Sequence, residues 1–378
     1  MTEPARGQQV TANTPLLAAF DQQADWCNQP APFTAHVLRR SQLWLAETAD
    51  AYAVFDALAS DPLAAAVPLR WVGGLHLLAL RGLLPWAQLW PPAAGAQAVT
   101  DLQKDAQIDA AISLAWLTQQ AVLRDALSRP PQTNEVQRSA ALLPGLLFIA
   151  HSTGLPLSLL EIGASAGLNL WCDRWALAPL LEPDAAPWSY GPADAPLTLR
   201  PAWIGAPPPL QALLQAPLQI CRRAGCDAEP IDLTEPGQAE RLASFIWPDQ
   251  VERLQRLRAA QTAACGWMAS ERLSVQALSA ARFVQQELRT LRTGMTTVLM
   301  HSVVWQYIAA DEQQSITAAV HDAASHATAT NPLAWLRFEP ASLMGNVELR
   351  CQLWPGGADH LLARCHPHGA HIHWLAGA

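Results

Sequence analysis

The sequence predicts an α/β protein in two parts, an all-helical N-terminal domain at 1–128 and a larger domain at 129–378 with a mostly parallel sheet. Three observations lead to this prediction. Apolar residues in the first part recur at the three- and four-residue spacing of a helix face. From residue 129 onward, strand-like and helix-like segments alternate, which is typical of βαβ units. The 378 residues also exceed what one compact core of ordinary size accommodates.

The helical domain is expected to begin with segments at 16–25, 35–58 and 67–83, which are rich in Ala, Leu and Trp and are separated by prolines. The clearest helix is 104–127, because its apolar residues share one face. A further helix over 135–151 is expected at the start of the second domain.

The second domain should contain several strands in alternation with helices. The expected strands are 157–162, 218–221, 273–275, 297–303, 332–338, 347–354 and 360–374. Helical segments are expected at 239–264, 275–291 and 311–327. The last two strands follow each other without room for a helix, so they should pair antiparallel. Nine prolines in 176–216 indicate a loop-rich insertion with short strands at most.

Composition restricts the classes of function. Charged residues are 15% of the chain, against about 25% in an average soluble domain, and apolar residues are 51%, so a globular protein is expected. The net charge is -8 and no basic block occurs, which argues against nucleic acid as a partner.

The sequence also bears on location. None of the seven cysteines belongs to a CxxC pair, and the N-terminus has no apolar stretch of the kind that directs secretion. Reduced thiols and a cytoplasmic location are therefore expected. The longest uncharged stretch, 139–160, contains proline and glycine breakers and is interpreted as helix, turn and strand rather than as a membrane span. No membrane partner is expected.

A small-residue turn after the first expected strand is the most informative segment. Glycines on both sides of Ala-Ser-Ala allow the backbone to approach a bound nucleoside, and the N–H groups of a helix expected directly after the turn can meet a carboxylate. The candidate cofactor-binding residues here are Glu161, Gly163, Ala164, Ser165, Gly167 and Asn169. The alternative is a tight strand-to-helix turn that binds nothing.

A second acidic position supports the nucleoside interpretation. Asp227 follows the next expected strand, where a doubly wound fold presents a carboxylate to a ribose diol. The separation from Gly167 is longer than usual, and the proline-rich insertion accounts for the excess. Asp227 has an alternative role as a turn or N-cap residue.

The same turn also has the GxSxG pattern of a nucleophile elbow, which would make Ser165 an acyl-transfer nucleophile. A hydrolase needs an acid and a histidine on later strand ends, and Asp311 with His321 or His366 has the right order. An elbow normally follows several strands, however, whereas the chain before residue 157 is expected to be helical.

Two further groups of polar residues have both structural and functional interpretations. Asn134, Glu135 and Arg138 lie at a helix start, where capping explains them, yet an Arg there can clamp a carboxylate of cofactor or substrate. Near the C-terminus, histidines alternate at 366, 368, 371 and 373, but their spacing matches no metal signature and no metal is expected.

Five motifs in order resemble a bacterial family catalogued as domain of unknown function 2332. The motifs are at 132–138, 161–174, 225–232, 247–250 and 301–302. The core of that family is similar to class I S-adenosylmethionine-dependent methyltransferases. The resemblance implies a Rossmann-like core with a mostly parallel seven-stranded sheet, S-adenosylmethionine as cofactor and a small-molecule acceptor.

The resemblance also implies residue roles. Glu161 and the two glycines would be the acidic residue and the glycine-rich turn that end the first strand. Asp227, with Pro230 three positions later, would be the acidic residue that ends the second strand and holds the ribose. His301 takes the position of the class's active-site polar residue, where many members have Asp or Asn, and Ser302 after it is a candidate cofactor-binding residue. Glu271 is the candidate for the adenine-contacting acid.

The expected reaction is methyl transfer, in which most of the catalysis is positioning. His301 is the expected general base because imidazole titrates near neutral pH, and Glu135 is the second choice. Trp305 and Tyr307 follow the fourth strand of the implied core and could form an aromatic wall for the substrate, or simply pack. A rival function is a non-catalytic cofactor-binding or regulatory protein on a degenerate methyltransferase fold.

Overall fold

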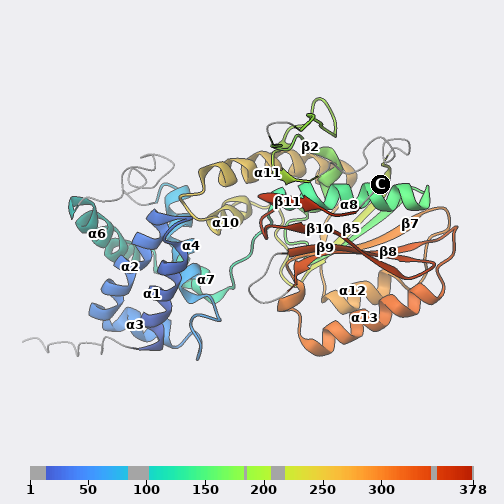
Figure 1. The fold of residues 1–378 in the computed structure, drawn as a ribbon. Coiled ribbons are helices and arrows are strands. Elements are labelled where there is room, and N and C mark those ends of the chain that lie inside the picture. The colour runs from blue at the N-terminus through green and yellow to red at the C-terminus, as the bar shows by residue number, and fades with distance from the viewer. Residues whose placement is uncertain (1–13, 84–101, 183–184, 206–217, 342–346, 377–378) are drawn as a thin grey trace, which may run out of the picture. The chain divides into compact units, whose positions relative to one another are not determined.

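The structure is a computed structural model that describes residues 14–83, 102–182, 185–205, 218–341 and 347–376. The chain divides into two compact units, each formed from two stretches of sequence (Figure 1). Unit 1 comprises Met1–Thr133 with Gly237–Gln255, and unit 2 comprises Asn134–Pro236 with Arg256–Ala378. The stretch 237–255 comes from the region that was expected to belong to the second domain.

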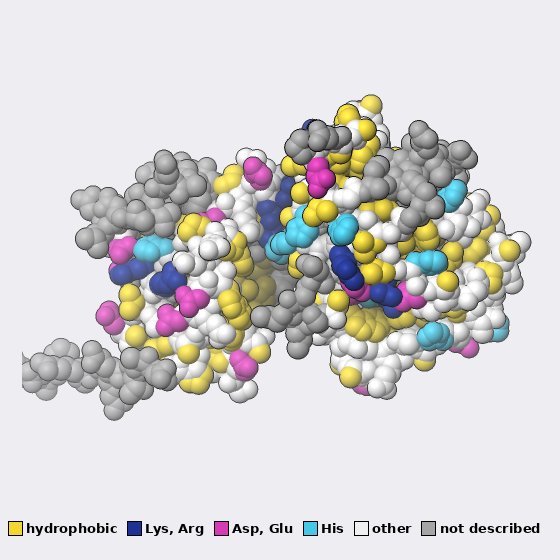
Figure 2. Space-filling view, in the orientation of Figure 1, with side chains coloured by type: hydrophobic (Ala, Val, Ile, Leu, Met, Phe, Trp, Pro, Cys, Tyr) yellow, Lys and Arg dark blue, Asp and Glu magenta, His cyan; other side chains and the backbone are white. Residues whose placement is uncertain are grey.

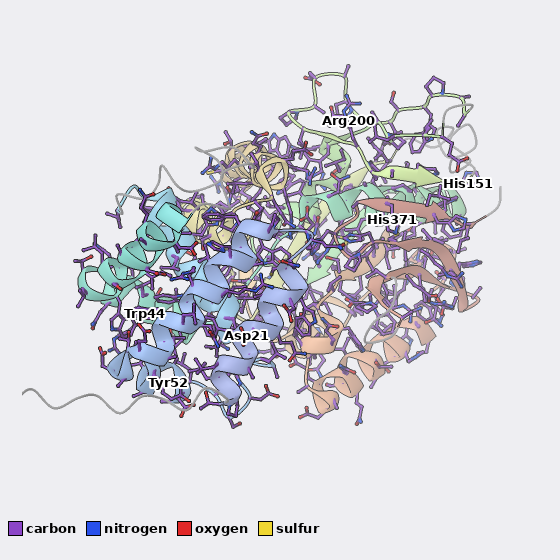
Figure 3. All side chains as sticks on the ribbon, turned by 60° about the vertical axis from the view of Figure 1, so that its left-hand side comes forward. Asp21, Trp44, Tyr52, His151, Arg200 and His371 are labelled. Atoms are coloured by element: carbon purple, nitrogen blue, oxygen red, sulfur yellow. The ribbon has the colours of Figure 1, made fainter. Side chains whose placement is uncertain are left out.

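Unit 1 is helical where it is described. Its helices are α1 (Pro15–Cys27), α2 (Pro32–Glu47), α3 (Ala49–Asp56), α4 (Val67–Leu80), α6 (Leu102–Thr118), α7 (Gln120–Ser128) and α10 (Gln238–Ser244). Prolines begin α1 and α2, because the first turn of a helix does not need the missing N–H. Aromatic rings fill the core: Trp44, labelled in Figure 3, stacks on Trp71 with ring centroids 5.5 Å apart, and Phe55 meets Trp71 edge-on at 5.1 Å.

Residues 237–255 are fixed to unit 1 by hydrogen bonds. The Asp249 carboxylate accepts the backbone N–H groups of Phe33 at 2.8 Å and Thr34 at 2.9 Å, so it caps α2. The single helix expected over 239–264 is wrong, because α10 ends at Ser244 and α11 (Val251–Glu271) begins after a break around Pro248.

Unit 2 contains the sheet and its helices. The first half has η2 (Val136–Arg138), α8 (Ser139–Thr153), β1 (Leu157–Ile162), η3 (Leu168–Arg174), β2 (Ala176–Leu177), β3 (Thr198–Leu199), β4 (Ala202–Ile204) and β5 (Ile220–Asp227). The second half has β6 (Val275–Ala277), α12 (Ala280–Glu287), β7 (Thr296–Ser302), η4 (Trp305–Tyr307), α13 (Ala310–Ser325), β8 (Leu333–Pro340), β9 (Val347–Trp354), β10 (Ala358–Cys365) and β11 (His371–Trp374).

The large sheet has nine strands in the order β4-β11-β10-β9-β8-β7-β1-β5-β6, so the expectation of seven strands is wrong. The segment expected as one strand over 360–374 forms the two antiparallel strands β10 and β11. β4 adds the other strand, because it leaves the proline-rich insertion to pair with β11. The antiparallel pairing of β9 with β10 is confirmed.

Five neighbouring strands, β6, β5, β1, β7 and β8, are parallel. From β1 the chain adds β5 and then β6 on one side of β1, and then β7 and β8 on its other side. The direction in which strands are added therefore reverses between β1 and β7. In open α/β sheets, ligands bind beyond the carboxyl ends of strands at such a reversal.

Helices pack on both faces of the sheet (Figure 1). α12 and α13 contribute Phe283, Ile316 and Val320 to an apolar cluster with Ile162 and Trp335 on one face. α8 lies against the antiparallel strands on the other face. Buried polar side chains occur at the carboxyl ends of β1 and β7, namely Glu161, His301 and Ser302.

The uncharged stretch 139–160 folds as helix, turn and strand, as expected. α8 ends at Thr153 and is capped by Gly154, whose φ of +66° is the left-handed conformation that glycine adopts without strain, and β1 follows. Within the described parts of the chain, no helix combines the length and the apolar character that crossing a bilayer requires.

Candidate functional site

The turn after β1 has an unusual backbone. Gly163, Ser165 and Gly167 all have left-handed φ values, of +66°, +53° and +72°. Ser165 therefore holds a conformation that glycine normally supplies. The expected helix directly after the turn is wrong, because the seven residues of η3 form a 3-10 helix with a kink at Trp171. The turn thus has no α-helix N-terminus to offer to a carboxylate.

The two glycines make room for neighbouring side chains. A Cβ atom on Gly163 would lie 2.4 Å from Cγ2 of Val304, in the segment after β7. A Cβ atom on Gly167 would lie 2.9 Å from Cε of Met268 and 3.0 Å from Cγ2 of Val275. Open space for a nucleoside was expected at these positions, and protein atoms occupy it instead.

Asp227 connects β5 to this turn. Its Oδ2 accepts the N–H of Ser165 at 2.8 Å, and its Oδ1 accepts the N–H of Glu229 at 3.0 Å. The carbonyl oxygen of Ser165 in turn accepts the N–H of Ile231 at 3.1 Å. Asp227 therefore acts as a turn residue, which was the alternative to binding a ribose. It lies at the carboxyl end of β5, beside β1, where a carboxylate that binds the ribose was expected.

Asn134, Glu135 and Arg138 are buried and hold backbone groups around the site. Oδ1 of Asn134 accepts the N–H of Leu168 at 2.9 Å, and Oε1 of Glu135 accepts the N–H of Gln137 at 3.1 Å. The Arg138 guanidinium donates to the carbonyl oxygens of Ser302 and of residue 367, both at 2.9 Å. These contacts fix the turn after β1, the end of β7 and the β10–β11 hairpin relative to one another.

Several buried polar atoms beside the turn have no protein partner. They are Oε2 of Glu161, Oγ of Ser165 and Nδ2 of Asn169. Burial raises the pKa of the Glu161 carboxyl well above its usual range. Buried polar groups in native proteins nearly always have a partner, so this group of atoms marks a place for water or a polar ligand.

A histidine–carboxylate pair lies at the carboxyl ends of β7 and β8. Nδ1 of His301 is 2.6 Å from Oε1 of Glu339, and the same oxygen accepts the N–H of Val304 at 3.1 Å. His301 is only 1% exposed, and its Nε2 has no partner. Glu339 was not among the residues predicted from the sequence, although an acidic residue at the end of a strand beside β7 was a usable signal.

The turn after β7 resembles the turn after β1 in one respect. Val303 has a left-handed φ of +53°, which is rare for a β-branched residue. Because Val304 fills the space above Gly163, the two turns pack directly on each other. The reversal point of the sheet is therefore lined by two turns with strained residues, and such residues occur preferentially at functional sites.

The remaining predicted residues lie in different surroundings. Trp305 stacks on the His301 ring, with centroids 5.2 Å apart and planes 21° apart, whereas Tyr307 is 76% exposed. Glu271 forms an ion pair with Arg174 across the η3 and α11 segments. Glu271 therefore has a protein partner in Arg174, and its contact with adenine stays a prediction.

A cavity of about 420 Å³ lies beside the turn. It is lined by Pro230, Ile231, Asp232, Thr234, Met268, Ala269, Arg272, Leu273, Ser274 and Val275. Met268 and Val275 also fill the space at Gly167, so the cavity adjoins the Gly167 end of the turn. The volume is within the usual range for small-molecule sites.

The C-terminal histidines gather over β10 and β11, where Figure 2 shows histidine side chains on the surface and Figure 3 labels His371 on β11. The His366 ring lies 5.4 Å from the rings of His368 and His371. In the described parts of the chain, no group of three or more His, Cys, Asp or Glu residues has the arrangement of a metal site.

The structure favours the hydrolase interpretation in one respect and opposes it in others. Ser165 has the left-handed φ of a nucleophile elbow, but its Oγ is buried and has no histidine partner, whereas an elbow exposes the nucleophile beside its base. The proposed partners have other contacts: His321 packs on Trp354 of β9, Nδ1 of His366 accepts the N–H of His368, and Asp311 lies in the first turn of α13.

Comparison with known proteins places the chain in a family. A family model described as "Uncharacterized protein conserved in bacteria (DUF2332)" matches residues 17–374. No curated protein and no solved structure matches the chain.

Proposed function

Since the chain belongs to the DUF2332 family, whose description names no reaction, we propose its function from the site itself: transfer of a methyl group from S-adenosylmethionine to a small-molecule acceptor. The observation that carries the proposal is the turn of three left-handed residues at the reversal point of the parallel strands. A glycine-rich turn at such a reversal is the place where a doubly wound fold binds a nucleotide.

The unpartnered polar atoms fit the polar groups of that cofactor. Glu161 and the Asn169 amide are suited to its amino-acid part, and the Ser165 hydroxyl to a ribose or carboxylate oxygen. The cavity beside Gly167 is a suitable place for the adenine base, since apolar side chains line much of it. A nucleoside that approaches Gly163 has to displace Val304, so binding is expected to move the turn after β7.

The residues of the chain would contribute to catalysis mainly by positioning. When bound, S-adenosylmethionine supplies a methyl group on a positively charged sulfur. Arg138 and Asp227 hold the turns in place through their backbone contacts, and His301 is the residue that can accept a proton from the acceptor. The proposal includes a cytoplasmic location, since all seven cysteines are free thiols.

Methyl transfer can be tested before the acceptor is identified. The purified protein is incubated with S-adenosylmethionine labelled with ¹³C in the methyl group and with a bacterial metabolite extract. New ¹³C-methyl resonances are then sought by NMR. The proposal predicts at least one product that heat-inactivated protein does not form. If the native and heat-inactivated proteins give the same spectrum, the chain is not a methyltransferase for any metabolite in the extract.

A non-catalytic cofactor-binding or regulatory protein on a degenerate methyltransferase fold is the second candidate function. The observations in its favour are the side chains that fill the spaces above Gly163 and Gly167, and the 3-10 helix in place of an α-helix after the turn. Cofactor binding without any methylated product would support this candidate. Covalent labelling of Ser165 by a fluorophosphonate, lost in Ser165→Ala, would instead indicate the hydrolase.

A further inference from the structure

The contact between His301 and Glu339 determines which ring nitrogen of His301 carries the proton. An ionised carboxylate only accepts hydrogen bonds, so the 2.6 Å contact between Oε1 of Glu339 and Nδ1 of His301 places the ring proton on Nδ1. The lone pair of the neutral ring is then on Nε2, which is buried and has no protein partner.

The orientation of both partners is fixed. Oε1 of Glu339 also accepts the N–H of Val304, which belongs to the turn after β7. The imidazole contacts the Trp305 ring, stacked at 5.2 Å, and the Trp335 ring at 6.0 Å, and these two indole rings also contact each other at 5.7 Å. These contacts restrict the rotation of both side chains.

We infer that Glu339 is a positioning residue that holds His301 as the proton acceptor of the reaction, and that the methyl acceptor is an N–H or O–H nucleophile such as an amine, an alcohol or a phenol. This inference rests on the proposed function. A carboxylate or thioether acceptor carries no proton on the attacking atom, so it would give Nε2 nothing to accept.

The step balances with the groups named. The lone pair of the nucleophile forms a bond to the methyl carbon, and the electrons of the broken S–C bond return to sulfur. The proton of the nucleophile moves to Nε2, and the imidazolium is stabilised by the Glu339 carboxylate until it releases a proton to solvent. No oxidant or further reactant is needed.

Histidine NMR tests the inference in the full-length chain. The protein is labelled with ¹⁵N in its 11 histidines, and His301→Asn identifies the signals of residue 301. We expect a single tautomer with the proton on Nδ1. Glu339→Gln, which keeps an acceptor oxygen, should retain this tautomer, whereas Glu339→Leu should give a mixture of both.

Glu348→Gln is the matched control variant, because Glu348 lies directly opposite Glu339 in the β8–β9 register and pairs with Arg350 instead. It should leave the His301 signals unchanged. Thermal melting shows whether Glu339→Leu is folded, and the wild-type and Glu339→Gln spectra decide the tautomer if it is not.

Addition of S-adenosylmethionine or S-adenosylhomocysteine separates the two proposals. Binding should shift the Nε2 signal of His301 and leave that of His321, on α13, in place. If calorimetry shows binding but the His301 signals do not move, or if the wild-type proton is on Nε2, the inference is overturned and cofactor binding stands. If neither compound binds, both proposals fail.

Discussion

Replacement of Gly163 by alanine is expected to destabilise the protein for two separable reasons. An alanine at a φ of +66° costs about 1–2 kcal/mol relative to a right-handed conformation. In addition its Cβ would lie 2.4 Å from Cγ2 of Val304, and overpacking of this kind typically costs about 1–3 kcal/mol. The expected loss in the free energy of unfolding is therefore about 2–5 kcal/mol.

Gly154→Ala is the matched control. Gly154 has the same φ of +66°, but a Cβ there would meet no atom within 4 Å. The loss of unfolded-state entropy is the same in both variants, so it cancels in the comparison. The control should lose only about 1–2 kcal/mol.

Equilibrium urea denaturation at 25 °C measures both losses, and Val304→Ala in the Gly163→Ala background should recover part of the larger one. The two single variants must differ by at least about 1 kcal/mol if Val304 fills the space above Gly163. Equal losses for Gly163→Ala and Gly154→Ala, with no recovery in the double variant, would refute the packing of the two turns.

Three further predictions concern single carboxylates. Burial raises the pKa of folded Glu161 well above the ordinary value of 4.5, so wild-type stability should fall as pH rises above that value, by up to about 1.4 kcal/mol per pH unit until the folded pKa is reached. Glu161→Gln has no carboxyl group to ionise, so its free energy of unfolding relative to the wild type, measured by urea denaturation, should increase between pH 5 and pH 8. A difference that stays constant over this range would contradict the burial argument. Asp227→Ala removes the acceptor of two backbone N–H groups, so the melting temperature should fall and the cofactor affinity should fall by at least roughly tenfold. Asp227→Asn keeps one acceptor oxygen and should retain part of both. If Asp227→Ala has the melting temperature and the calorimetric affinity of the wild type, this prediction is wrong. Asp249→Ala removes the cap of α2 and should cost about 1–2 kcal/mol in unfolding experiments, and an unchanged midpoint would show that the cap is dispensable.

The sequence predicted the parallel part of the fold well, because β1 and β7 have apolar centres and are buried along their whole length. β5 was harder to delimit, since Arg222 and Arg223 interrupt its apolar pattern and their ion pairs with Glu287 and Asp173 are visible only in three dimensions. The pairing of β4 with β11 joins positions far apart in the chain, so local periodicity contained no signal for it.

The candidate site was predicted as a list of residues but not as an arrangement. Small residues at Gly163 and Gly167 indicate only that something approaches closely, and sequence patterns do not say whether a ligand or a side chain does so. Val304 and Met268 are the side chains that approach. Glu339 was missed because its role depends on the β7–β8 register, which brings it beside His301.

The central claim, a cofactor site at the reversal point of the sheet, is tested most directly by titration calorimetry with S-adenosylmethionine and S-adenosylhomocysteine. We expect both compounds to bind with dissociation constants in the micromolar range, about -8 kcal/mol, and Asp227→Ala to weaken the binding of both. Asp311→Asn, in the first turn of α13, is the control that should bind as the wild type does. Absence of binding by either compound at about 1 mM would contradict the claim.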